Sequence, residues 1–481
     1  MVSNTAPSAA LLLALLCASC APEVALLETG LPSVGSAKQP TASLKVDASQ
    51  IRPMYERRML AVDLPTVVRV ALARNIDIQE AQQRVAASQG ELEANVGKIF
   101  PSISPNIMAI GLQGAVSTPA GLAVETFKHV IPYAAALQWI INPGQVAYDI
   151  IASKRRLDAS AQEDQAVLME TTQTAAIQYY DVVLAQAQVA AARQAIADAD
   201  ELLRLDRLQF MTGTGLNVDV ERANAALAVR QQNLLLALNG FYNASVALTL
   251  TLHLDPTVML VPRAGNMSAA TLVREDLSID RLLVLAVQYR PDLQAVRSLF
   301  ASAEADTGST IWGGLGPQVA ATRTFAPKPP ARTLVDTEYR QQLYNVSAGF
   351  NWSAATFGRI RTATANANIA GLEVDRQLDQ VQAAVVTLQQ TSFTTKRTIP
   401  IAQQGVTAAE EALRLTQKNL QAGTGLTLDV LTAQDAANQA RLNYASAIVR
   451  YNQAEVNLLA TVGLLNEGNV EPIDGRAARR H

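Results

Sequence analysis

The sequence is short of the residues from which most catalytic and metal centres are built. It has three histidines, His129, His253 and His481, which lie far apart, and two cysteines, Cys17 and Cys20, both near the start. Scattered histidines argue against a histidine-based centre, and two early cysteines provide no disulfide framework. The motifs of phosphate-binding loops, zinc proteases and serine nucleophile elbows are missing too. We therefore predict no enzyme activity, no cofactor and no metal site.

Charge of one sign and long apolar runs are also lacking. Charged residues make up 17% of the chain, and the formal net charge is −3 with both signs mixed. No basic face indicates nucleic acid as a partner. The mean hydropathy is +0.11, yet beyond the N-terminus we find no uncharged apolar run of the roughly 20 residues that a membrane helix needs. Such a chain fits a core-rich globule, an oligomer or a β-barrel with weak signals in each strand.

The first residues predict export. Residues 9–16 form a short apolar core followed by Cys17-Ala18-Ser19-Cys20, so residues 1–19 read as a signal peptide. Small residues before Cys20 resemble the bacterial lipoprotein motif, which predicts lipidation of Cys20. Two features depart from that motif: Cys17 stands where leucine is usual, and no basic residue precedes Lys38. A plain signal peptide or a misassigned start remains the alternative.

Glycine and proline are missing from long stretches that therefore predict helices. Neither residue occurs from Gln145 to Thr212, and a helix of that length would extend roughly 100 Å at 1.5 Å per residue. Breakers are also few in Leu216–Asp255, Leu372–Ala422 and Leu426–Val462. Pro400 should bend or split its helix. A shorter helix is predicted from residue 63 to residue 97.

One turn occurs twice in the chain. Residues 213–220 read Gly-Thr-Gly-Leu-Asn-Val-Asp-Val, and residues 423–430 read Gly-Thr-Gly-Leu-Thr-Leu-Asp-Val. Residues 71–79 and 286–294 echo each other at a similar separation. We interpret the chain as a tether over 20–62, two repeats over 63–262 and 263–465, and a tail over 466–481. Each repeat carries a long helical hairpin with its tip at the glycines.

Each repeat also shows a pair of predicted strands before its hairpin. Residues 344–352 alternate between apolar and small polar side chains, residues 133–141 form their partner, and weaker strands cover 103–112 and 318–325. Period two is typical of a barrel wall between lipid and water, although a small soluble sheet packed on helices explains the pattern slightly better. Four strands cannot close a barrel without open edges in lipid, so a barrel would need several chains.

From about residue 63 to residue 463 the chain resembles the TolC-like family of outer-membrane efflux proteins, which includes lipidated members. The resemblance rests on the two repeats, the element order, the helix lengths and the two tip motifs. It implies a mainly α fold with a small β part: a homotrimer whose strands form a twelve-stranded barrel in outer-membrane lipid of a Gram-negative bacterium, above a helical periplasmic tunnel. The implied partners are a periplasmic adaptor protein and an inner-membrane transporter.

The implied function is export, and small-molecule efflux is the leading hypothesis. Type I protein secretion and polysaccharide export are alternatives within the same class. A periplasmic coiled-coil scaffold is an alternative of another class, which would need no strand pairs.

The resemblance also assigns roles to the two turns. It implies adaptor-docking tips formed by Gly213, Thr214, Gly215, Leu216 and Asp219, and by Gly423, Thr424, Gly425, Leu426 and Asp429. Asp219 and Asp429 are candidates for a periplasmic gate, and their carboxylates would also suit a helix start. Leu420 and Gly425 occupy the positions where related channels carry a tyrosine and an arginine that hold the gate closed. That latch is therefore expected to be absent.

Overall fold

The computed structural model describes residues 59–118, 121–263, 267–274, 277–325, 342–350 and 352–469. The chain divides into two units, Met1–Glu56 and Arg57–His481, and every described residue belongs to the second unit. Cys20 and the predicted signal peptide lie outside the described residues.

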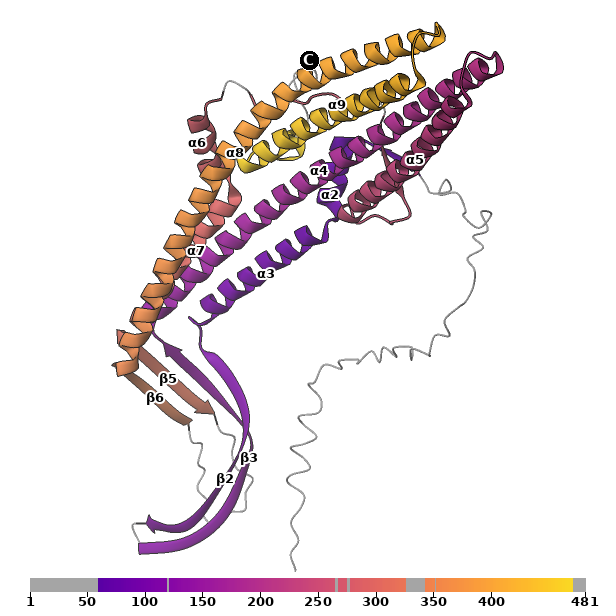
Figure 1. The fold of residues 1–481 in the computed structure, drawn as a ribbon. Helices are drawn as coiled ribbons and strands as arrows, with labels where there is room; N and C mark the ends of the chain where they lie inside the picture. The colour runs from indigo at the N-terminus through magenta and orange to yellow at the C-terminus, as the bar shows by residue number, and fades with distance from the viewer. Residues whose placement is uncertain are drawn as a thin grey trace, which may run out of the picture. The chain divides into compact units, whose positions relative to one another are not determined.

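Long helices dominate the described part of the chain, and their order repeats (Figure 1). The first half contains α2 (Leu64–Arg74), α3 (Ile76–Gly97), α4 (Pro143–Met211) and α5 (Asn217–Thr251). The second half contains α6 (Ile279–Tyr289), α7 (Pro291–Leu315), α8 (Ala354–Gln421) and α9 (Thr427–Thr461). With 69 residues in α4 and 68 in α8, each of these helices is roughly 100 Å long.

The predicted helix over residues 63–97 is in fact two helices. It begins as expected, because the Asp63 side chain accepts a hydrogen bond from the Thr66 backbone N–H at 3.0 Å. It then breaks at Asn75, whose side chain accepts from the backbone N–H of Asp77 at 2.7 Å and thereby starts α3. The second half breaks at the equivalent place, before Pro291, which opens α7. Local capping and proline geometry override the apolar periodicity at both sites.

Pro400 does not split its helix. α8 runs without interruption from Ala354 to Gln421 with Pro400 inside it, and Figure 1 shows α8 changing direction along its length. A proline removes one backbone hydrogen bond and crowds the preceding turn. In α8 the helix continues on both sides of this defect, where it packs along α9.

Four strands form a single antiparallel sheet. They are β2 (Ser102–Thr118), β3 (Gly121–Ile141), β5 (Pro317–Phe325) and β6 (Gln342–Phe350), and their order in the sheet is β2-β3-β5-β6. The two hairpins join through β3 and β5, with Trp139 opposite Ala321. Side chains 344–350 of β6 are all exposed. Among the described elements no helix packs along this strand, which does not favour the alternative of a soluble sheet packed on helices.

A second, smaller sheet was not expected from the sequence. β1 (Met59–Val62) pairs in parallel with β4 (Met259–Pro262), so the strand pair links the start of the folded unit to the segment after α5. The main apolar cluster surrounds it, with Val67 and Val68 of α2, Tyr179 of α4 and Leu248 of α5 among its buried side chains.

Polar side chains of α9 hold the connection between β4 and α6. The buried Glu455 carboxylate accepts hydrogen bonds from the backbone N–H groups of Leu272 and Val273 at 2.8 and 2.9 Å. Its other oxygen accepts from the Ser392 hydroxyl of α8. One turn earlier, Asn452 accepts from the backbone N–H of Ala270 at 2.8 Å. These bonds satisfy backbone groups of a segment that has no sheet or helix partner of its own.

α5 qualifies the prediction that no membrane-length apolar run follows the N-terminus. Among the described helices it alone has the length and hydropathy to cross a membrane, with a mean of 1.4 over its best window. It packs along α4 as the second arm of a hairpin. Its outward side chains include Leu235 and Leu250, which are 68% and 66% exposed in the single chain. The signal therefore reflects an uncovered apolar face rather than a buried core helix.

Candidate functional site

The two glycine turns close the long hairpins with the same backbone geometry. Gly213 and Gly423 follow the last residues of α4 and α8 with φ angles of 78° and 74°, the left-handed region that glycine tolerates best. The Gly213 N–H bonds to the Phe210 carbonyl at 3.1 Å, and the Thr214 N–H bonds to the Gln209 carbonyl at 2.9 Å. The second turn repeats both bonds at Gly423 and Thr424. This is a Schellman motif, which satisfies the carbonyls at a helix end.

The second glycine of each turn allows a close backbone approach. A Cβ on Gly425 would lie 2.9 Å from the Leu420 backbone nitrogen, and a Cβ on Gly215 would lie 2.9 Å from the Gln209 Cβ. Gly425 occupies the position at which related channels are expected to carry a latch arginine. In this turn the Cβ of any larger residue at position 425 would crowd the backbone nitrogen of Leu420.

The two tip aspartates occupy equivalent helix positions but differ in surroundings. Each lies in the first turn of its helix, where the dipole favours a carboxylate. Asp219 is half-buried and forms an ion pair with Arg222 at 3.2 Å. Asp429 is exposed, and Thr432 stands where Arg222 stands in the first hairpin. Of the two tip aspartates, Asp429 is thus the one with no ion pair to a described residue.

Both tips expose bulky apolar side chains. Leu216 and Leu426, predicted as docking residues, are each 67% exposed. Sequence reasoning missed others: Met211 is 82% exposed, and Val218 and Leu428 are half exposed. Bulky apolar residues next to a turn that reverses two helices were the available signal. Exposed apolar groups gathered at one end are typical of a protein-binding surface.

The fold brings the two tips together. A small apolar cluster lies just behind them and draws on all four long helices, through Leu202 of α4, Ala223 of α5, Leu420 of α8 and Val430 of α9. Towards the tip, Gln209 Nε2 donates to the Leu420 carbonyl at 2.8 Å. The two hairpins therefore form one paired end, which the sequence predicted only as two separate turns.

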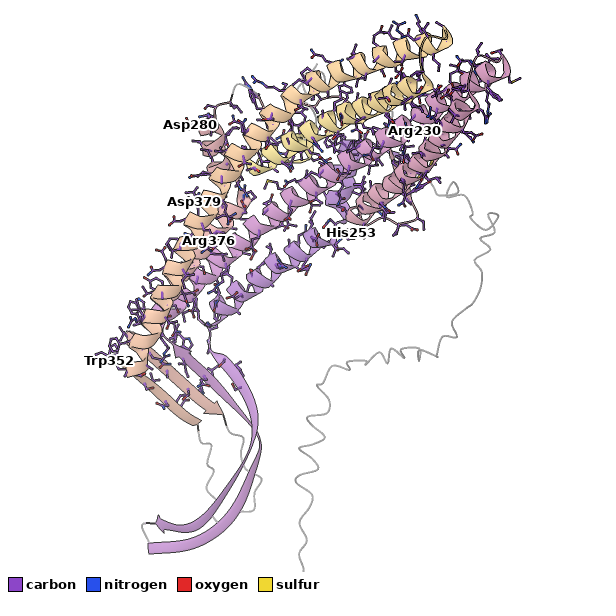
Figure 2. All side chains as sticks on the ribbon, in the orientation of Figure 1. Arg230, His253, Asp280, Trp352, Arg376 and Asp379 are labelled. Atoms are coloured by element: carbon purple, nitrogen blue, oxygen red, sulfur yellow. The ribbon has the colours of Figure 1, made fainter. Side chains whose placement is uncertain are left out.

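Further from the tip, the hairpins are joined by charged and amide groups. The Asp198 carboxylate of α4 forms an ion pair with Arg441 of α9 at 3.3 Å. The Asp198 backbone carbonyl accepts a hydrogen bond from Gln434 Nε2 of α9 at 2.7 Å. Arg230 of α5 pairs with Asp435 of α9, and Figure 2 shows Arg230 on the half of the helices nearer the tips. These contacts lie on helix faces that periodicity alone does not distinguish from solvated ones.

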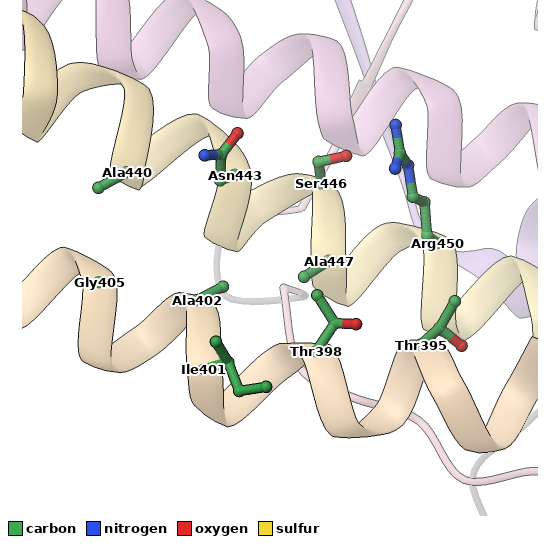
Figure 3. Close-up of a pocket in the computed structure, with 10 residues that line it drawn as sticks. All are labelled: Thr395, Thr398, Ile401, Ala402, Gly405, Ala440, Asn443, Ser446, Ala447 and Arg450. Carbon is green, nitrogen blue, oxygen red and sulfur yellow. The ribbon is translucent and has the colours of Figure 1, made fainter.

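A shallow groove runs between α8 and α9 further from the tips. It has a volume of about 480 Å³ and is lined by Thr395, Thr398 and Gly405 of α8 and by Asn443 and Arg450 of α9. Figure 3 shows the two threonines facing α9 across it. The lining could contact polar groups of a solute, but it presents no buried charged group, so we treat the paired tips as the functional site.

A pair of glycine substitutions tests the turn geometry. Gly423→Ala forces a Cβ into the left-handed region and should destabilise the hairpin by about 1–2 kcal/mol. Gly405→Ala is the matched control, because Gly405 lies inside α8 with open space around its Cβ position. That change should stabilise the helix by roughly 0.5–1 kcal/mol. Thermal melts of the purified protein should shift in opposite directions; equal shifts would contradict the assigned turn.

The described residues contain no group of three or more histidine, cysteine, aspartate or glutamate side chains that could hold a metal ion. The tips instead combine glycine turns, exposed apolar side chains and carboxylates. Such a surface is suited to binding another protein.

Comparison with known proteins finds similarity across both halves of the chain. A family model described as outer membrane efflux protein matches residues 67–252 and 282–464. The pyoverdine export outer membrane protein OpmQ of Pseudomonas aeruginosa is 23% identical over 464 residues, which cover 90% of this chain and 93% of OpmQ. Nodulation protein T of Rhizobium leguminosarum is 21% identical over 421 residues, covering 83% of this chain and 85% of the relative.

Solved structures share the fold. The outer membrane protein VceC of Vibrio cholerae superposes with a TM-score of 0.71 at 17% identity, covering 83% of this chain and 96% of VceC. At that identity the likeness speaks for the architecture alone.

Proposed function

Because this chain belongs to the outer membrane efflux protein family, and is thus an outer-membrane channel protein that extends into the periplasm, we propose that it works as a homotrimer. Three copies would form one continuous conduit, with the four-stranded sheets in the membrane and the long helices in the periplasm. The conduit would export substrates delivered by an inner-membrane transporter through a periplasmic adaptor protein.

The observation that carries this proposal is the open sheet. β2 and β6 are edge strands with no further partner among the described residues, and backbone groups at an open edge cannot remain unpaired in lipid. Three sheets joined edge to edge would close a barrel of twelve strands. Trp352, 76% exposed beside the end of β6, suits the membrane boundary, where aromatic girdles occur; Figure 2 shows it where the sheet meets α8.

The helical part also supports assembly. α5 exposes Leu235, Leu236 and Leu250, and α8 exposes Ile401, which lies at a similar distance from the tip; each is more than 60% exposed. Outward apolar faces on both the first and the second hairpin match a ring in which α5 of one copy packs on α8 of the next. Such a heterologous contact closes into a ring when the rotation permits.

The two tips are the proposed docking surface for the adaptor. Leu216 and Leu426 would insert into the adaptor as apolar side chains. The turns that present them are formed by Gly213, Thr214, Gly215, Gly423, Thr424 and Gly425. Asp219 and Asp429 would line the periplasmic entrance. Signal-peptide removal and lipidation of Cys20 would anchor the mature protein to the outer membrane.

Small-molecule efflux is our proposed cargo class, since one relative is described as exporting pyoverdine, a small molecule. Type I protein secretion and polysaccharide export use conduits of the same kind and remain the alternatives. The residues at the tips do not depend on which cargo passes.

Assembly can be tested at the strand edges. The double variant carries one cysteine in place of Ile103 on β2 and another in place of Val346 on β6, both strongly exposed positions. We expect a short thiol-reactive linker to join these cysteines between neighbouring chains. Cross-linked dimers and trimers should appear in outer-membrane fractions from the double variant. Each single variant should remain monomeric on denaturing gels, and a wild-type protein recovered as a soluble monomer would overturn the proposal.

A further inference from the structure

One buried carboxylate near the tips has no counter-charge. Asp206 of α4 is only 2% exposed. Its Oδ1 accepts a hydrogen bond from the Thr427 hydroxyl of α9 at 2.8 Å. Its Oδ2 is buried and accepts no hydrogen bond from the described residues. Burying a carboxylate with one of its oxygens unpaired is costly, so such a group calls for an explanation.

Asp206 lies at the boundary between the two hairpins. It follows Leu202 and Leu203 by about one helical turn, beside the apolar cluster that they share with Val430 of α9. Gln209, almost one turn further, makes the last cross-hairpin bond before the turns. Thr427 is the first residue of α9 and is itself buried. The bond thus ties the last turns of α4 directly to the start of α9.

We propose that Asp206 is a positioning residue of the periplasmic gate, whose bond to Thr427 holds the first hairpin against the second. The inference rests on the proposed channel function. The bond between Asp206 and Thr427 would help to close the tips in this chain, where Leu420 and Gly425 replace the tyrosine and arginine expected of the family latch. It also makes closure depend on one proton in each chain.

The charges around Asp206 weaken this contact when the carboxylate is ionised. From α5 the facing charge is Asp219, a second carboxylate, whose own partner is Arg222. From α9 the facing groups are the uncharged Thr427 and Val430, and the next carboxylate on that helix, Asp429, is exposed. No cation on the packed helices bonds to Asp206 among the described residues, so ionisation costs desolvation and adds repulsion.

The sign of the resulting pH dependence follows from these groups. Burial raises the pKa of Asp206 above its usual value, the bond from Thr427 lowers it by less, and the charge of Asp219 adds a smaller increase. When the hairpins separate, Asp206 meets water and its pKa returns to an ordinary value of about 3.9. The paired state therefore binds the proton more tightly. The proton therefore stabilises the paired state fully below the ordinary pKa, and this stabilisation is lost as the pH rises through the raised pKa of Asp206.

Single-channel recording in planar bilayers tests the proposal. For the wild-type trimer we expect the open fraction to fall by roughly threefold or more between about pH 7.5 and about pH 4, close to the ordinary pKa of a carboxyl. Asp206→Asn keeps an oxygen for Thr427 but cannot ionise, so its channel should be mostly closed at both pH values. Thr427→Val removes the donor and should raise the open fraction at neutral pH, whereas Thr427→Ser should restore the wild-type value.

The outcomes separate this inference from the channel proposal. A wild-type pH response that persists unchanged in Asp206→Asn, or equal open fractions in Thr427→Val and Thr427→Ser, would overturn the role of Asp206 and leave the channel intact. A wild-type protein that gives no conductance and no trimer would instead reject the channel itself. Trimer yield on gels shows whether each variant still folds, since a merely structural role would lower yield without changing the pH profile.

Discussion

Replacing Leu216 and Leu426 together by aspartate is expected to abolish adaptor binding and export. Both side chains are 67% exposed in the single chain, so the substitution removes no buried contact and should leave folding intact. In a docked complex each leucine would be desolvated, and an apolar anchor of an interface typically contributes 2 kcal/mol or more, about thirtyfold in affinity. Each added carboxylate would also be buried without a partner, which increases the loss.

Co-purification of the adaptor with tagged protein from the native membrane measures this effect. The double variant Leu216→Met and Leu426→Met is the control, because methionine keeps an exposed, flexible apolar side chain. It should capture the adaptor at close to wild-type levels, while the double aspartate variant should capture little. Undiminished capture by the aspartate variant, at equal outer-membrane abundance, would mean that the tips are not the docking surface.

Glu455→Ala is expected to cause the largest loss of stability of any single change considered. The substitution leaves two buried backbone N–H groups, of Leu272 and Val273, and the Ser392 hydroxyl without their acceptor. Each unsatisfied buried donor costs about 1–3 kcal/mol, so the total should be on the order of 4 kcal/mol. The segment before α6 should then detach from α9.

Thermal melts and limited proteolysis distinguish local from global damage. We expect a lower melting temperature and new tryptic cleavage at Arg274, which directly follows this segment. Glu455→Gln keeps one acceptor oxygen and the same shape, and its amide can still donate to Ser392, so it should retain most of the stability. A melting temperature in Glu455→Ala equal to that of Glu455→Gln would show that the two backbone bonds contribute little.

The sequence anticipated the larger elements well because their signals are local. The absence of breakers predicted α4 within two residues at its start, and the tip glycines marked the end of each hairpin's first arm. The helix predicted to start at residue 63 does begin there, where the Asp63 side chain accepts a hydrogen bond from the Thr66 N–H. The alternation around Val346 gave β6, and the weaker pattern after residue 317 gave β5.

The features that the sequence did not predict depend on contacts with residues distant in the chain. β1 and β4 are four residues each and become strands only because they pair with each other. The break at Asn75 needs a side chain to compete with the helix it interrupts. Asp206 looked like any polar residue of a long helix, since nothing near it in sequence indicates that Thr427 will cover it.

The sequence by itself determined that this chain is built from long hairpins with glycine tips and four strands, because helix length, turn conformation and strand alternation are encoded within a few neighbouring residues. Only the tertiary structure decided how the halves meet. It paired the two tips, joined the strand pairs into one open sheet, and buried Asp206 and Glu455 against segments far away in the chain. Those contacts depend on which faces pack together, and periodicity identifies a face without naming its partner.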